Sequence, residues 1–178
     1  MAPDARRSQA GYTLIEVVIS VAIGAILMAA LTSVVLTSVR AADIASSRVE
    51  ASGQLRSFEF FAYDDFAGSG VPDTATCGDS SSTACTTQPI TLAGVGVSNS
   101  VSPAPSASSV TYTWDSTNFF LDRKVGANPA IHAATDVSAF SWYVDSSGAS
   151  PVVVVRLKVT VSNYSESQTL LFYPRLNP

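Results

Sequence analysis

The sequence predicts an α+β fold, in which one long amino-terminal helix packs on a carboxyl-terminal antiparallel β-sheet of four to five strands. Two observations predict this fold. Residues 12–66 have the composition of a continuous helix, apolar in residues 12–39 and amphipathic in residues 40–66. Residues 110–178 contain short alternating runs separated by turn residues. A Ser/Gly/Pro-rich loop over residues 67–109 is expected between them, so that residues 40–178 form one globular domain.

The composition is that of a mildly acidic chain with few charges. The 178 residues carry ten Lys and Arg and fourteen Asp and Glu, a net charge of −4. The many Ser, Thr and Ala residues are typical of an extracytoplasmic surface. Nucleic acid needs a concentrated basic patch. Because the cations are scattered along the chain, nucleic acid is not expected to bind the whole domain, although a small local patch stays open.

Glu16 stands at the start of a long apolar segment. Val17 to Val39, 23 residues in all, include no Asp, Glu, Lys, Arg or His, which is about the length of a helix that crosses the hydrocarbon core of a bilayer. A charged side chain at the bilayer centre costs on the order of 2.5–3.5 kcal/mol on insertion scales, and less near the end of a helix. Glu16 is therefore expected to have a partner of opposite charge.

Three interpretations of the amino terminus compete. A cleaved secretory signal, with its basic region at residues 6–7 and its cleavage site at residues 39–41, would have an apolar stretch of roughly 7–15 residues, and this one is longer. An uncleaved anchor with both arginines in the cytoplasm agrees with the positive-inside tendency but leaves Glu16 without a partner. A cut between Gly11 and Tyr12 places a new α-amino group four residues before Glu16, at the same membrane depth.

The third interpretation is supported by a family resemblance. The sequence G-Y-T-L-I-E at positions 11–16, followed by an apolar helix, resembles the class III signal of type IV pilins and of type II secretion pseudopilins. The resemblance implies that residues 1–11 form a leader, that a membrane-embedded prepilin peptidase removes it after Gly11, and that the new first residue, Tyr12, is N-methylated. Phe is more common than Tyr at this position in the family. Gly11 has no side chain, which lets the scissile backbone approach the peptidase closely.

The same resemblance gives Glu16 a role in assembly. It implies that Glu16 pairs with the free amino terminus of a neighbouring subunit, which neutralises the buried charge. The chain would be stored in the cytoplasmic (inner) membrane as a single-pass protein with its amino terminus in the cytoplasm, and would later enter an extracytoplasmic filament at the cell surface. The implied partners are membrane lipid, the prepilin peptidase, the inner-membrane assembly platform and other pilin or pseudopilin subunits.

The helix is expected to continue beyond the membrane as an amphipathic helix. In residues 40–66, apolar residues recur at a roughly helical spacing, at Val49, Leu55, Phe58, Ala62 and Phe66. Phe60 and Phe61 are interpreted, like Phe58, as core residues under a sheet rather than as a ligand-stacking surface. Residues that end helices follow at Gly68, Gly70 and Pro72.

Both cysteines lie in the Ser/Gly/Pro-rich loop. Cys77 and Cys85 enclose seven residues, and in an oxidising compartment such a pair is most simply a disulfide that pins the loop. Metal binding is the alternative, but a zinc site needs about four ligands, and the single histidine, His132, is remote in sequence. His132 is interpreted as a loop residue. One short strand is expected in the long loop, around Ile90 to Leu92.

The carboxyl-terminal strands are expected in VTYTW, FFLDRKV, VSAFSWYV, PVVVVRLKVTV and QTLLFY, with turn residues such as DSTN, DSSGAS and NYSES between them. The order of these strands, with a final YPRLN, resembles that of the PilW-like and PulJ-like minor subunits.

Residues for catalysis are scarce. Asp64 and Asp65 are adjacent, so they do not face each other on a helix. With one histidine and no free cysteine expected, acid–base and thiol catalysis lack their usual residues. The sequence has no nucleotide-binding or metalloprotease motif. No enzyme activity, catalytic residue, metal or cofactor is therefore expected, with calcium at the Asp- and Ser-rich loops left open.

These observations together predict a structural protein. The expected function is that of a minor pilin-like subunit of a type IV pilus or related filament, assembled through its amino-terminal helix and supporting pilus biogenesis, adhesion, motility or DNA uptake. One alternative is a type II secretion pseudopilin of the PulJ-like kind. The other is a membrane-tethered extracytoplasmic binding module, such as an adhesin or a DNA receptor.

Overall fold

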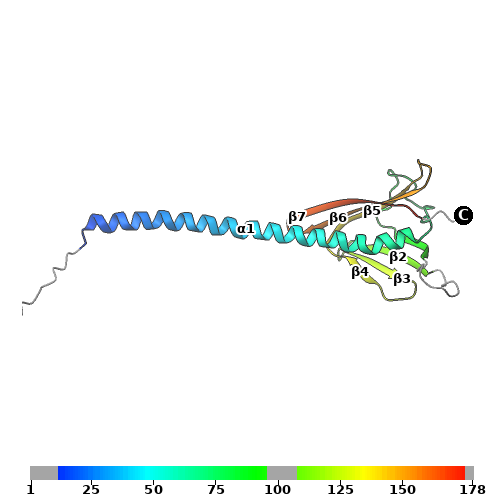
Figure 1. Ribbon diagram of the computed structural model, residues 1–178, viewed down its shortest axis with the longest axis horizontal. Coiled ribbons are helices and arrows are strands. Elements are labelled where there is room, and N and C mark those ends of the chain that lie inside the picture. The colour runs from blue at the N-terminus through cyan, green and yellow to red at the C-terminus, as the bar shows by residue number, and fades with distance from the viewer. Residues whose placement is uncertain (1–11, 96–107, 175–178) are drawn as a thin grey trace, which may run out of the picture. The chain divides into compact units, whose positions relative to one another are not determined.

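The computed structural model describes residues 12–95 and 108–174, which form one helix and seven strands (Figure 1). The helix, α1, comprises Leu14–Ala67. The strands are β1 (Ile90–Val95), β2 (Ser108–Asp115), β3 (Phe120–Val125), β4 (Ile131–Ala134), β5 (Val137–Asp145), β6 (Val152–Val161) and β7 (Tyr164–Phe172). The chain divides into two compact units, one ending at Asp43 and the other beginning at Ile44.

The strands form two antiparallel sheets, one with the order β1-β2-β3-β4 and one with the order β5-β6-β7. The predicted class, a long helix with antiparallel strands, is confirmed, and so is the short strand that begins at Ile90. The single sheet of four to five strands is wrong. The strand β4 has only four residues, too few to show an alternating pattern, and the chain changes sheets at Asp136, which has a φ of 58°. His132, which the sequence analysis interpreted as a loop residue, therefore lies in strand β4.

The second half of α1 supplies one side of the domain core. Ala51, Leu55, Phe58, Ala62 and Phe66 are buried, which confirms four of the five predicted positions. The fifth, Val49, is 75% exposed, and Phe60, also predicted to be buried, is 75% exposed. Each lies two residues from a buried position, about 200° of rotation at 3.6 residues per turn, and so points away from the core.

Aromatic side chains join this half of the helix to both sheets. The ring of Phe66 stacks on Phe172 of β7, with centroids 4.2 Å apart, and lies 6.1 Å from Tyr112 of β2. Phe58 meets Tyr112 edge to face at 5.5 Å. The helix ends at Ala67, where Ser69 donates from its hydroxyl to the carbonyl of Phe66. The buried residues of α1 and of both sheets thus form one hydrophobic core.

Candidate functional site

The first half of α1 exposes apolar side chains on all sides. From Leu14 to Val39, the large apolar side chains are between 51% and 83% exposed. Within the described part of the chain, α1 is the one helix that is long and apolar enough to cross a membrane. A helix that is apolar all round is normally covered by protein or by lipid. This surface therefore needs lipid or other helices around it.

The hydroxyl groups of this segment are satisfied within the helix. Each donates to a carbonyl oxygen three or four residues earlier, at 2.8–2.9 Å. The donors are Ser20, Thr32, Ser33, Thr37 and Ser38. Because an unsatisfied polar group in hydrocarbon costs several kcal/mol, these hydrogen bonds make the segment compatible with lipid.

Glu16 lies in the first turn of α1. The carbonyl of Thr13 accepts hydrogen bonds from the backbone N–H groups of Glu16 at 3.0 Å and Val17 at 3.3 Å, so the chain is helical from this point. The spacing from Thr13 to Glu16 is that of a capping box, in which a Glu or Gln follows a Ser or Thr by three residues. A negative charge in the first turn also interacts favourably with the helix dipole. The Thr-x-x-Glu pattern is visible in the sequence and offers a second interpretation of Glu16, as a helix-capping residue.

Of the two predicted processing residues, Gly11 and Tyr12, the structure describes Tyr12. Tyr12 is 82% exposed. Gly11 and the rest of the predicted leader, residues 1–11, lie outside the described residues. Tyr12 and Thr13 thus immediately precede α1, and Glu16 lies in its first turn.

A buried ionic cluster holds the other end of α1, in the last turn, against the first sheet. Asp65 is 3% exposed, and its two carboxylate oxygens accept from Arg123 of β3, Oδ2 from Nε at 2.6 Å and Oδ1 from Nη2 at 2.7 Å. The hydroxyl of Tyr112 donates to the same Oδ2 at 2.5 Å. Asp64, its neighbour in sequence, is exposed. The two carboxylates thus point into different surroundings.

The cluster raises the pKa of two of its members, Tyr112 and Arg123. Burial, with the hydrogen bond to Asp65, raises the pKa of the Tyr112 hydroxyl far above its ordinary value. The hydrogen bonds to the Asp65 carboxylate raise the pKa of Arg123 further, and its guanidinium also lies 5.3 Å from the ring centroid of Phe61. The phenol of Tyr112 therefore stays neutral and the guanidinium of Arg123 stays charged over the whole physiological pH range.

Further polar contacts tie the same part of α1 to the second sheet and to the segment between the sheets. The hydroxyl of Ser52 donates to Glu166 of β7 at 2.8 Å. The side-chain oxygen of Gln54 accepts from the backbone N–H of Thr135 at 2.9 Å. These contacts fix the rotation of the helix about its axis. They therefore also fix the direction of the helix face that carries the exposed Val49 and Phe60.

The predicted disulfide between Cys77 and Cys85 is present, with the Cα atoms 5.3 Å apart. The loop that it closes lies along the free edge of β5. Cys85 and Trp142 exchange backbone hydrogen bonds of 2.8 and 2.9 Å, and Val144 donates to the carbonyl of Gly78 at 2.6 Å. Gly78 has a φ of +82°, and a Cβ atom there would lie 3.0 Å from the sulfur of Cys85. The disulfide-bonded loop, residues 77–85, thus protects an edge strand.

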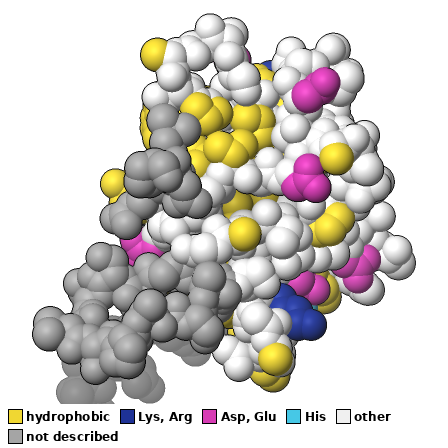
Figure 2. Space-filling model, turned by 90° about the vertical axis from the view of Figure 1, so that its right-hand side faces the viewer, with side chains coloured by type: hydrophobic (Ala, Val, Ile, Leu, Met, Phe, Trp, Pro, Cys, Tyr) yellow, Lys and Arg dark blue, Asp and Glu magenta, His cyan; other side chains and the backbone are white. Residues whose placement is uncertain are grey.

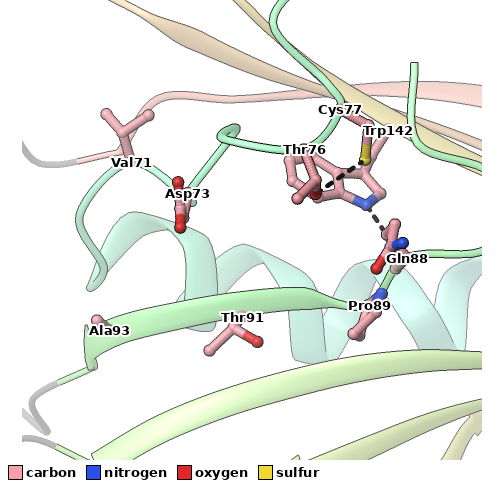
Figure 3. A pocket seen from close by; sticks show the side chains of 9 residues that line it. All are labelled: Val71, Asp73, Thr76, Cys77, Gln88, Pro89, Thr91, Ala93 and Trp142. Atoms are coloured by element: carbon pink, nitrogen blue, oxygen red, sulfur yellow. Dashed lines mark hydrogen bonds between the residues drawn. The ribbon is translucent and has the colours of Figure 1, made fainter. Parts of the chain in front are cut away.

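A cavity of about 440 Å³ lies between the segment of residues 71–77, which follows α1, and residues 88–93, which include the start of β1 (Figure 3). Its lining includes the indole of Trp142, whose Nε1–H donates to the carbonyl of Gln88 at 3.1 Å, and one charged side chain, Asp73. The Asp73 carboxylate already accepts from the backbone N–H of Ala75 at 2.9 Å. On the end of the domain seen in Figure 2, hydrophobic side chains gather in one area and acidic side chains are scattered.

The described His, Cys, Asp and Glu side chains do not form a metal site. His132 of β4 has a carboxylate partner, Asp122 of β3, with Nδ1 and Oδ1 2.6 Å apart, and its ring lies against Phe120. In residues 12–95 and 108–174, no group of three or more His, Cys, Asp or Glu side chains is placed to hold a metal ion.

Comparison with known families finds a match on the amino-terminal segment. A family model described as the prokaryotic N-terminal methylation motif matches residues 6–32. No curated protein and no solved structure shows a significant match to the chain. The matched residues include Gly11, Tyr12 and Glu16 and end within the apolar half of α1. The chain therefore carries at residues 6–32 the prokaryotic N-terminal methylation motif, which is the signal of a type IV pilin-like precursor that prepilin peptidase processes.

Proposed function

We propose that this protein is a structural, non-enzymatic minor subunit of a type IV pilus or a related filament. The observation that carries the proposal is the combination of the methylation motif with a helix that exposes apolar side chains on every side. In the cytoplasmic membrane, lipid covers these side chains. In a filament, the helices of other subunits replace the lipid, and close packing between helices supplies the attraction.

Glu16 selects the position of each new subunit. Once the leader is removed, the α-amino group of Tyr12 is positively charged and Glu16 is negatively charged, and both lie at the start of the helix. A buried charge is tolerated when a partner of opposite sign is present. Pairing of the amino group of one subunit with Glu16 of its neighbour satisfies both charges and fixes the relative height of the two helices.

The domain is displayed on the filament and catalyses no reaction. Its partners are other pilin-like subunits, the prepilin peptidase and the assembly platform of the inner membrane. A type II secretion pseudopilin would carry the same signal, so loss of secretion after gene deletion, with surface filaments intact, would favour that system. A membrane-tethered binding module would keep its leader and stay in the membrane fraction.

The first test is processing at Gly11. In the wild-type protein, mass spectrometry of membranes and of sheared filaments should find an amino terminus at N-methylated Tyr12. In Gly11→Val, a branched side chain should obstruct the peptidase, so the intact chain should accumulate in membranes. Ala10→Val, one residue earlier, is the matched control and should be processed. A Gly11→Val protein that begins at Tyr12 would overturn this part of the proposal.

A further inference from the structure

The outer face of the β5-β6-β7 sheet carries two cations side by side. Arg156 and Lys158 are exposed residues of β6, the central strand. Being two residues apart on one strand, they point to the same side of the sheet, with Cα atoms about 6.6–6.8 Å apart. The alternate residues Val155, Leu157 and Val159 are buried on the other side. The strand therefore holds both cations on the solvent face at a fixed spacing.

Hydroxyl groups flank the two cations on the neighbouring strands. Arg156 pairs in register with Ser141 of β5 and Thr169 of β7, and Lys158 pairs with Ser167 of β7. These residues, with Thr86, line a shallow hollow of about 320 Å³. Guanidinium, ammonium and hydroxyl groups are the donors that proteins use for phosphate oxygens.

Among the residues that the structure describes, no carboxylate forms an ion pair with either cation of this face. Glu166 of β7 pairs in register with the buried Val159, and its carboxylate accepts from Ser52 of α1. Asp145 pairs with Val152, four residues before Arg156, which is about 13 Å at 3.3 Å per residue.

Two further features favour local attraction of an anion. The guanidinium of Arg156 lies 5.4 Å from the ring centroid of Tyr143, which restricts its position. The net charge of the chain is −4, but at about 0.1 M salt the Debye length is roughly 10 Å. Charges elsewhere on the protein are then largely screened, so the cations of this face dominate the interaction.

We propose that this face, defined by Arg156, Lys158, Ser141, Ser167 and Thr169, binds the phosphates of a phosphodiester polymer without reading its bases. The arginine and the lysine contact successive phosphates, and the three hydroxyl groups donate to the remaining oxygens. Each domain contributes about two charge contacts, so a single site is weak. Several copies in one filament would bind one polymer together, which raises the overall affinity by effective concentration.

The test uses the full chain in nonionic detergent micelles and a fluorescent single-stranded oligodeoxythymidylate of about twenty nucleotides. Binding is followed by fluorescence anisotropy at several salt concentrations. Two phosphate contacts to a single strand predict a slope of log K against log salt of about −1.4. Arg156→Ala and Lys158→Ala should each reduce the slope by about 0.7 and weaken binding roughly tenfold. Lys124→Ala, which removes an exposed cation from β3, is the matched control and should bind like the wild type.

Two competitors identify the chemistry that is recognised. An abasic oligonucleotide of the same length should compete as well as the oligodeoxythymidylate, because only phosphates are contacted, and polyphosphate should compete better than dextran sulfate at equal charge. Failure of the wild type to bind at about 0.1 M salt would overturn the proposal. The proposal would also be overturned if Lys124→Ala lost as much affinity for the oligonucleotide as Arg156→Ala. The same holds if the abasic oligonucleotide failed to compete, or if dextran sulfate competed as well as polyphosphate.

Discussion

Asp64 and Asp65 show how far two adjacent carboxylates can differ. The first is exposed, and the second accepts three hydrogen bonds from side chains that lie 47 and 58 residues away in sequence. Removing one partner of a buried ion pair leaves the other charge uncompensated. Of the two aspartates, we therefore expect only Asp65 to contribute substantially to the free energy of unfolding.

The first prediction at this scale is that Asp65→Asn lowers the free energy of unfolding by about 3–5 kcal/mol, because the partly buried Arg123 loses its anion. Urea unfolding of the full chain in detergent, followed by tryptophan fluorescence, measures the change. Asp64→Asn is the matched control, since it makes the same chemical change at an exposed position, and it should stay within about 0.5 kcal/mol of the wild type. Equal effects of the two variants would contradict the role given to the cluster.

Tyr112 makes a prediction about pH. Its pKa in the folded protein is raised above the ordinary value of 10.0, chiefly by burial. The unfolded chain therefore loses this proton first as the pH rises, so the stabilisation is complete below about pH 10 and declines above it. Tyr112→Phe should remove this part of the decline between about pH 10 and 11, and should cost about 1–2 kcal/mol at neutral pH through the lost hydrogen bond. Unfolding curves measured at pH 7 and between about pH 10 and 11 test both effects. If the stability of Tyr112→Phe declines over this interval as much as that of the wild type, Tyr112 is not the cause of the decline.

At the scale of elements, the disulfide-bonded loop replaces a missing strand neighbour of β5. Exposed strand edges pair readily with other chains, and the loop occupies the edge at Trp142 and Val144. Closing a loop of this length stabilises a protein by about 2–3 kcal/mol in the chain-entropy model. We therefore expect the loop both to stabilise the domain and to reduce pairing of this edge with other chains.

The double variant Cys77→Ser, Cys85→Ser should lose about 2–3 kcal/mol of stability. It should also exchange the amide protons of Trp142 and Val144 faster, because both donate to the loop. Hydrogen exchange measured by mass spectrometry, with light scattering for self-association, tests this, and the amides of β7 serve as internal controls. Unchanged exchange at both positions would show that the loop holds the edge without its disulfide.

The elements also show what the sequence could and could not predict. The long helix, its end near Gly68 and most strands were predictable, because their patterns are local and regular. The strand β4, with the residues IHAA, has no alternation that could distinguish it from a loop. Val49 was assigned to the core by an approximate helical spacing, and Phe60 was assigned to it together with Phe58 and Phe61. The helical phase instead places Val49 and Phe60 each about 200° from a buried neighbour. The division into two sheets depends on pairings between distant strands, and no local pattern reports those.

At the scale of the whole molecule, the chain combines a domain that has its own core with a helical segment whose apolar surface is uncovered in the described part of the protein. The processing signal was predictable because six consecutive residues, G-Y-T-L-I-E, carry it. The cluster of Asp65, Tyr112 and Arg123 was not, because its members meet only after the helix packs on the sheet. The sequence alone thus indicates how the chain is processed more clearly than it indicates how the domain is held together.

Glu16 can be interpreted in two ways, as a helix-capping residue or as the partner of an amino terminus. The two interpretations differ in whether its negative charge is required. A capping box accepts Gln in place of Glu, whereas pairing with an amino terminus requires the negative charge. Glu16→Gln removes the charge and keeps the sequence pattern of a capping box. Thr13→Ala removes the hydroxyl that this pattern requires and keeps the charge of Glu16. The two variants are therefore matched, and they separate an assembly role from a helix-capping role.

The measurement that tests the filament proposal most directly is immunoblotting of sheared filaments and membranes from cells that express these two variants. Both proteins should insert and lose residues 1–11. Glu16→Gln should enter filaments at least tenfold less than the wild type, since an unpaired amine at a desolvated interface costs on the order of 3–5 kcal/mol, whereas Thr13→Ala should enter at close to the wild-type level. Wild-type incorporation of Glu16→Gln, together with depletion of Thr13→Ala, would show that Glu16 only caps the helix and would contradict the charge-pairing account.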